Sequence, residues 1–186
     1  MRCLIYANNP ELSWLRECFP DVDPYLLKIV NKPLLEYGLD LVSLMGVTDL
    51  RIVSDSSLKA MENYFKDGAK WGMKISYALA RQEDTLKDVY LKNYSFCKED
   101  DLLFWNGFFF VDYDSRTIKS SLDFSQSFCC NSPTPRLTFL RKGERFGSPM
   151  PEREKGITCL RINEVASVTD YYKLSMEILT EKNKNY

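Results

Sequence analysis

The sequence contains no histidine at any of its 186 positions. Histidine is the side chain that most often serves as a general base near neutral pH, so its absence excludes Ser-His and Cys-His nucleophilic sites. The six cysteines include no Cys-x-x-Cys pair, and a structural zinc site needs closely spaced cysteine or histidine ligands. We therefore expect neither a histidine-activated nucleophile nor a zinc site.

A bias toward one sign of charge is also missing, because 25 basic residues are balanced by 26 acidic ones. Such a chain has no field that would draw it to nucleic acid. No apolar stretch approaches the ~20 residues that span a bilayer, and the apolar part of Met1–Pro10 is short for a signal peptide. We expect a cytoplasmic protein without membrane insertion, in which Cys129-Cys130 is a pair of reduced structural thiols rather than a redox switch.

With 45% hydrophobic residues, the chain can bury a sizeable core within one domain. Its first half alternates short apolar runs with helical patterns, which is typical of an α/β protein. Leu102–Trp105, which is apolar throughout, is expected at the centre of a parallel sheet. Further strands are expected at 3–7, 50–53 and 73–79, a short extended piece at 26–30, and helices from Pro33 to Gly46, after Ser56 or Ser57, and over 84–94. We expect these residues on neighbouring strands: Leu4, Ile52, Ile75 and Leu103.

The second half is harder to interpret. Residues 115–135 are polar and broken, whereas Leu137–Arg141 and Ile157–Ile162 have the composition of strands and can pair with each other. The loop 141–155 between them carries both signs of charge, so we expect it to be mobile and solvated rather than a phosphate or partner site. A final helix is expected from Thr169-Asp170 onward.

Four segments carry a resemblance to a known family. They are Val30–Tyr37, Asp67–Tyr77, Asp101–Asp112 and Val165–Leu174. In this order and spacing they resemble the sugar-phosphate nucleotidyltransferases, which join a nucleoside triphosphate to a sugar 1-phosphate. The resemblance implies a Rossmann-like three-layer α/β/α fold of the nucleotide-diphospho-sugar transferase type, with a mostly parallel central sheet and the nucleotide at the carboxyl ends of its strands. It also implies a single domain over 1–186, with a core at 1–115, a reduced sugar-site region at 116–165 and a closing helix at 166–183.

The first two functional motifs of that family differ in this chain. Where the family has a glycine-rich phosphate loop, Ala7–Trp14 has no glycine and contains Pro10 and Glu11. Such a loop wraps backbone N–H groups around a triphosphate. The lysine of the second motif falls on Pro24, and Lys28 stands at a different register. Both changes remove groups that would neutralise phosphate charge.

Several residues remain as remnants of the family motifs. Asn31 and Lys32 match an Asn-Lys-Pro motif, Thr85 matches the third motif, and Asn106-Gly107 match the fourth. Asp84 stands where the third motif has a glycine before Thr85, and we interpret it as a helix N-cap. These remnants are the candidate substrate-binding residues.

Phe108 stands where the fourth motif has the aspartate that holds magnesium. Phenylalanine offers no oxygen ligand to a hard cation. Asp112 and Asp114 follow shortly, and we interpret them as solvated turn residues rather than displaced ligands. We expect Phe108 to be buried in the space that holds magnesium and phosphate in active relatives, with Glu11 and Trp14 closing over it.

Three hypotheses follow. The main one is a nucleotidyltransferase-like pseudoenzyme with a binding or regulatory role in nucleotide-sugar or polysaccharide biosynthesis, with no catalytic residue, metal or cofactor, and with a protein partner or a second copy of itself. The second is an active sugar-1-phosphate nucleotidyltransferase, or a related transferase, whose relocated site uses Lys28, Asp112, Asp114 and magnesium. The third is a sensor that binds a nucleotide or nucleotide sugar without turnover.

Overall fold

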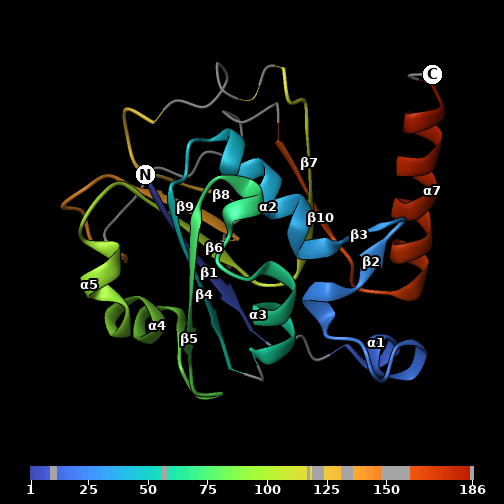
Figure 1. Ribbon diagram of the computed structural model, residues 1–186, viewed down its shortest axis with the longest axis horizontal. Coiled ribbons are helices and arrows are strands. Elements are labelled where there is room, and N and C mark those ends of the chain that lie inside the picture. Colours follow the sequence, from blue (N-terminus) through green and yellow to red (C-terminus); the bar gives the residue numbers. More distant parts are fainter. Residues whose placement is uncertain are drawn as a thin grey trace.

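A computed structural model describes residues 1–8, 12–55, 58–116, 118, 124–130, 136–147 and 160–184 (Figure 1). Its centre is a six-stranded sheet in the order β5-β4-β1-β6-β9-β8. The first four strands are parallel to their neighbours, and the last two are antiparallel. The strands are β1 (Arg2–Ala7), β4 (Asp49–Ser54), β5 (Lys74–Leu79), β6 (Leu102–Asn106), β8 (Phe128–Cys130) and β9 (Leu137–Leu140). The prediction of a mostly parallel sheet with these four neighbouring strands is confirmed.

Side chains alternate across the sheet and bury both faces of β1. Cys3 and Ile5 face a large cluster formed with α2 (Leu34–Leu44) and α3 (Lys59–Phe65), whereas Leu4 faces a smaller cluster under α4 (Leu86–Lys92) and α5 (Tyr94–Cys97). Figure 1 shows these two pairs of helices on opposite sides of the sheet. The three-layer α/β/α architecture predicted from the sequence is therefore confirmed.

Helix α2 begins as predicted, directly after Pro33, whose fixed φ suits a helix start. A small hairpin leads into it, formed by β2 (Lys28–Ile29) and β3 (Lys32–Pro33). The helix ends at Leu44 with Met45 as its C-cap, and Gly46, the predicted closing residue, follows directly. Its Gly38 lies against the indole of Trp105 on β6, so the sheet and this helix approach closely there.

The interpretation of Asp84 as a helix N-cap was wrong. Thr85 caps α4, in a capping box in which its side chain and that of Asp88 each accept a hydrogen bond from the other's backbone N–H. Asp84 accepts a hydrogen bond from the backbone N–H of Arg81 and pairs with Lys92. Thr85 rather than Asp84 is the N-cap because an acidic residue, Asp88, stands three positions after it and completes the reciprocal pair of hydrogen bonds. Ser56 and Ser57, the predicted caps of α3, lie outside the described residues.

The predicted pairing of the two late strands was also wrong. Strand β9 joins the main sheet between β6 and β8, whereas β10 (Leu160–Glu164) pairs antiparallel with β7 (Phe109–Tyr113) in a separate two-stranded sheet. The cause is the turn at Gly107, which takes the chain out of β6 and leaves that edge free for β9. Strand β8 lies within the region that the sequence marks as broken, and residues 157–159 lie outside the described residues.

At the described start of the charged loop, residues 141–145 and 147 are exposed, as expected of a solvated loop, and Phe146 is half-buried. Phe146 stacks on Tyr90, with ring centroids 5.7 Å apart, and meets Phe104 edge-on at 5.1 Å. Arg141 donates to the backbone carbonyls of Phe124 and Ser125. Residues 148–155 of the predicted loop lie outside the described residues.

The remaining elements are α1 (Ser13–Cys18), the 3-10 turns η1 (Pro24–Leu26) and η2 (Ala69–Trp71), and α7 (Val168–Lys184). Helix α7 starts one residue before the predicted position and stands at the edge of the molecule, where the Tyr171 hydroxyl donates to the Lys28 carbonyl (Figure 1). None of the helices in the described ranges has the length and apolar character that a bilayer crossing requires.

The contact between Gly38 and Trp105 gives a prediction about stability. A Cβ at Gly38 would lie 2.9 Å from the Trp105 ring, which is buried and stacked on Phe109 at 4.3 Å. Alanine gains ~1 kcal/mol in helix propensity, whereas overpacking costs ~1–3 kcal/mol. We expect Gly38→Ala to lower the free energy of unfolding by ~1 kcal/mol in urea denaturation.

The same substitution in a Trp105→Phe variant tests whether the contact with the Trp105 ring causes the loss of stability. In a Trp105→Phe variant the smaller ring leaves room for the methyl group, so the same glycine substitution should become neutral or stabilising. A Gly38→Ala variant as stable as the parent chain would contradict the close approach of helix and sheet.

Candidate functional site

The carboxyl ends of the parallel strands meet at one edge of the sheet, where open α/β folds bind their ligands. Strand β1 ends there and continues into Asn8, and β6 ends there and continues into Gly107. The Gly107 N–H donates to the Tyr6 carbonyl at 3.0 Å, and the Asn106 N–H donates to the Arg136 carbonyl at 2.8 Å. These bonds hold the turn after β6 between β1 and the residue that leads into β9.

Gly107 is required by this turn for two reasons. Its φ of +93° is in the left-handed region that glycine adopts without strain. A Cβ would also lie 2.6 Å from Nη1 of Arg136 and 3.6 Å from Oδ1 of Asn8. The Asn106-Gly107 remnant therefore has a structural task, which is to let the Arg136 guanidinium lie directly over the strand end.

Phe108, the residue after this turn, is 7% exposed, as predicted. Its partner is Tyr25 of η1, which meets it edge-on with ring centroids 5.8 Å apart. The ring contacts of Trp14 are with Phe19 and Tyr171 instead, with centroids 6.4 and 6.1 Å away. Glu11, the other predicted neighbour, lies outside the described residues.

Tyr25 joins η1 to the strand end. Its hydroxyl donates to the backbone carbonyl of Asn8 at 2.9 Å, with Oδ1 of the same residue at 3.3 Å. Burial raises its pKa well above the usual value for tyrosine, and the charges of Asp55 and Asp23 raise it further, while Arg136 opposes them. Tyr25 is therefore a neutral hydrogen-bond donor at physiological pH.

Arg136 is paired at this site. Its Nη2 lies 2.7 Å from Oε1 of Glu164, and its Nε also donates to that oxygen at 3.2 Å. A cavity of about 200 Å³ opens beside the pair. It is lined by Asn8, Leu12, Phe108, Arg136, Glu164, Val165 and Ala166. The cation that faces this cavity is thus already neutralised by a carboxylate.

These residues do not fit a divalent cation. Magnesium requires several oxygen ligands in octahedral geometry. The described residues contain no cluster of three or more carboxylate, cysteine or histidine side chains that could hold a metal. At the strand end itself, the apolar ring of Phe108 occupies the position where the resemblance implies a metal-binding carboxylate.

The other motif remnants lie away from the strand end. Lys32 pairs with Asp40 of α2 and its ammonium lies 4.6 Å from the centre of the Tyr37 ring. Asn31 is exposed in the turn of the β2–β3 hairpin, and Thr85 caps α4. Of the five remnants, the structure brings only Asn106 and Gly107 to the candidate site.

The relocated candidates also lie apart from it. Lys28 is exposed on β2, Asp112 stands on β7 opposite Arg161, and Asp114 forms an ion pair with Arg116 at 3.1 Å. Asp112 is four residues beyond Phe108, or ~13 Å along an extended strand. The strand end is instead formed by Tyr25, Arg136 and Glu164, which sequence reasoning missed.

Only one of these three residues has a sequence signal. Asp23 followed by Pro24 is a helix-start pattern, and the Asp23 side chain accepts the Tyr25 N–H at 2.9 Å. That pattern predicts a turn that would present the ring of Tyr25. Arg136 and Glu164 meet only because β9 and β10 lie in different sheets, which no local pattern indicates.

Comparisons with known proteins agree with the resemblance. A glucose-1-phosphate thymidylyltransferase of Xanthomonas campestris pv. campestris (strain B100) is 34% identical over 71 residues, which are 38% of this chain and 24% of the relative. Its counterpart from Streptomyces griseus is 31% identical over 86 residues, which are 46% of this chain and 24% of the relative. The match thus spans about a quarter of the length of these curated relatives. No family model matches the chain.

Solved structures show the same fold over almost the whole chain. Apo UDP-glucose pyrophosphorylase gives a TM-score of 0.62 at 12% identity and covers 97% of this chain and 98% of that one. UDP-glucose pyrophosphorylase in complex with UDP-glucose gives a TM-score of 0.58 at 13% identity, with the same coverage. The predicted resemblance to the sugar-phosphate nucleotidyltransferases is confirmed, and the likeness at this identity is one of fold.

The buried position of Phe108 gives a second prediction. In Phe108→Asp a charged carboxylate replaces an apolar ring beside Tyr25, and we expect the free energy of unfolding to fall by ~2–4 kcal/mol. Phe108→Leu, which stays apolar, should cost ~1 kcal/mol. Magnesium should not restabilise the aspartate variant, because Glu164 is already paired with Arg136 and the described residues contain no cluster of three or more metal ligands.

Thermal and urea denaturation with and without magnesium would measure both effects. An unchanged melting temperature in Phe108→Asp would mean that Phe108 is exposed and belongs to a partner-binding surface. A magnesium-dependent rise in that variant would mean that the strand end retains a metal site.

Proposed function

We propose that this chain, which is similar to the sugar-phosphate nucleotidyltransferases and has their fold, is a binding or regulatory protein of nucleotide-sugar or polysaccharide biosynthesis that does not itself catalyse nucleotidyl transfer. The observation that carries the proposal is the packing of Phe108 on Tyr25 at the carboxyl end of β6. This apolar contact occupies the strand end, where a nucleotidyltransferase must hold magnesium and phosphate.

The chemistry of nucleotidyl transfer explains why this contact supports the proposal. Phosphoryl and nucleotidyl transfer need little covalent help from a protein, so positioning and neutralisation of phosphate charge account for most of the catalysis. Removal of one preorganised donor costs ~10²–10³ in rate. With Phe108 at the position where the resemblance implies the metal-binding aspartate, this strand end lacks the group that would organise the phosphates.

The electrostatics of the cavity point the same way. Arg136 is the cation that lines it, and Glu164 is bound to that cation through two nitrogens. A triphosphate entering here would have to displace a carboxylate and would meet its negative charge. At about 200 Å³ the cavity is also below the ~300–1,000 Å³ that sites for small organic ligands occupy.

A nucleotide-sugar sensor is the second candidate. The open face of the cavity combines Arg136 with the side chain of Asn8, and breaking the Arg136–Glu164 pair would free a guanidinium for one phosphate group. The solved pyrophosphorylase in complex with UDP-glucose indicates the class of ligand to try first. An active enzyme with a relocated site is the third candidate, and it is the one of the three that requires magnesium.

The proposal includes a cytoplasmic location, a single domain and a protein partner or second copy, as predicted from the sequence. A regulatory role needs such a partner, because a protein without turnover acts through what it binds. The chain matches only part of its curated relatives, so the activity of those enzymes is a starting point for tests and not a property assigned to this chain.

A turnover assay tests the proposal. We expect no pyrophosphate release when the chain is incubated with magnesium, a panel of nucleoside triphosphates and a panel of sugar 1-phosphates, because Phe108 stands at the position where the resemblance implies the metal-binding aspartate and the described residues contain no cluster of three or more metal ligands. A thymidylyltransferase measured in parallel provides the positive control. Release that is lost in Asp112→Asn would show the relocated-site candidate to be right and this proposal wrong.

Nucleotide titration read by thermal shift separates the remaining candidates. A regulatory protein that acts through a partner should show no shift with nucleotides or nucleotide sugars. A sensor should show a shift without turnover, and Arg136→Gln should abolish it. Lys173→Gln is the matched control, because it removes an exposed cation of α7 that is not among the residues lining the cavity.

A further inference from the structure

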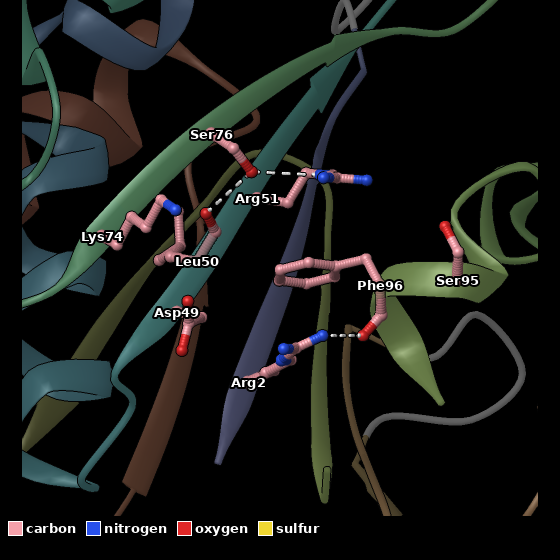
Figure 2. A pocket seen from close by; sticks show the side chains of 8 residues that line it. All are labelled: Arg2, Asp49, Leu50, Arg51, Lys74, Ser76, Ser95 and Phe96. Atoms are coloured by element: carbon pink, nitrogen blue, oxygen red, sulfur yellow. Dashed lines mark hydrogen bonds between the residues drawn. The ribbon is translucent and has the colours of Figure 1, made fainter. Parts of the chain in front are cut away.

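A second pocket lies at the opposite edge of the sheet, where the parallel strands begin. It has a volume of about 300 Å³ and is formed by β1, β4, β5 and α5 (Figure 2). Its lining residues are Arg2, Asp49, Leu50, Arg51, Lys74, Ser76, Ser95 and Phe96. Strand β1 is six residues long, so the two edges are separated by ~20 Å and the pocket is distinct from the strand-end cavity.

The pocket exists because the helices on this face are short. Helices α4 and α5 have seven and four residues, and they cover the apolar side chains around Leu4 and Val53. Toward the amino ends of the strands the same face carries polar side chains. In register, Arg2 lies beside Asp49, and Asp49 lies beside Lys74. A face that is normally buried in a three-layer fold is therefore open and basic here.

The two arginines of the pocket are held in place by neutral groups. The ring of Phe96 lies between their guanidinium groups, 5.0 Å from that of Arg2 and 4.6 Å from that of Arg51. Arg2 donates to the Phe96 carbonyl at 2.8 Å, and Arg51 donates to Oγ of Ser76 at 3.1 Å and to Oδ1 of Asn93 at 3.3 Å. Figure 2 shows both arginines reaching toward the Phe96 ring.

Among the described residues, no carboxylate forms an ion pair with the three cations of the pocket. None of the ion pairs found among the described residues includes Arg2, Arg51 or Lys74. Asp49 is the acidic residue of the lining, and its carboxylate accepts from the Thr48 hydroxyl. Three cations against one anion leave a net positive charge, which is unfavourable unless solvent or a bound anion compensates for it.

We propose that this pocket binds the phosphate group of a small phosphate monoester. Arginine forms two parallel hydrogen bonds with a phosphate, and lysine adds a compact charge. The stacked guanidinium groups are preorganised, so little side-chain freedom is lost on binding. The exposed hydroxyl of Ser95 adds a further donor, whereas that of Ser76 already donates to the Leu50 carbonyl at 3.4 Å. The volume suits a sugar or nucleoside body rather than a macromolecule. This inference is independent of whether the strand-end cavity binds anything.

The pocket's place in the fold assigns its ligand a role. A ligand bound ~20 Å from the carboxyl ends of the strands cannot be in contact with a reactant held there. The occupant would therefore act as an effector, and not as a substrate of the strand-end cavity.

Isothermal titration calorimetry of the full chain at low salt tests the proposal. The probes are inorganic phosphate, a hexose 1-phosphate and a nucleoside monophosphate, with glucose as the uncharged comparison. We expect binding of at least one phosphate probe, no binding of glucose, and affinity that falls as salt rises. The relative affinities of the three probes show whether the organic part is a sugar, a nucleoside or absent.

Variants at an exposed position keep the test independent of folding. Lys74 is exposed and its side chain makes none of the hydrogen bonds seen among described residues, so Lys74→Met should weaken phosphate binding about tenfold, and Lys74→Glu should abolish it. Lys59→Met, an exposed lysine on α3 across the sheet, is the matched control and should bind as the parent chain does.

Two results would overturn the proposal. One is the absence of heat with every phosphate probe at low salt. The other is phosphate binding that Lys74→Glu leaves unchanged and Arg136→Gln removes, since that would place the anion at the strand-end cavity. If phosphate binds in the proposed pocket, Arg136→Gln should leave the affinity for phosphate unchanged.

Discussion

The structure depends on the burial of β1 between β4 and β6. Its residues Cys3, Leu4, Ile5 and Ala7 have no exposed surface, and both of its edges form hydrogen-bonded ladders. Each face must therefore be covered by helices, because a parallel strand in the middle of a sheet cannot leave apolar side chains in water. Polar groups of β1 can reach solvent only at its two ends, so any chemistry of this sheet is confined to those edges.

The two edges differ in how their polar groups are partnered. At the carboxyl edge the rings of Phe108 and Tyr25 pack against each other, and Glu164 neutralises the charge of Arg136. A small cavity without net charge remains there. At the amino edge the covering helices stop short, and Arg2 and Arg51 stay open to solvent. The edge where this fold is expected to bind ligands is thus the less charged of the two, which is why the two proposals concern different parts of the molecule.

The sequence predicts the first half of the fold well and the second half poorly, for a physical reason. Strands such as Leu102–Asn106 and helices such as Leu34–Leu44 have local signals, namely apolar runs, a proline at the start and a glycine near the end. The partners of β9 and β10 depend on where the chain turns after Gly107, which is a long-range property. The basic pocket was missed for a related reason, because Arg51 and Lys74 belong to strands whose apolar residues dominate the pattern.

The motif remnants explain why a resemblance can predict this fold and leave the activity open. Gly107 is needed for a left-handed turn under Arg136, Lys32 pairs with Asp40 beside the start of α2, and Thr85 caps α4. Each of these tasks contributes to folding whether or not a nucleotide binds. Under the proposed function, positions that serve only the reaction have no such second task, and Phe108 stands where the resemblance implies one of them. A buried aromatic pair there stabilises the chain, whereas a carboxylate without its metal would cost several kcal/mol of desolvation. A chain that no longer needed to bind magnesium would therefore gain stability by exchanging that carboxylate for an apolar ring.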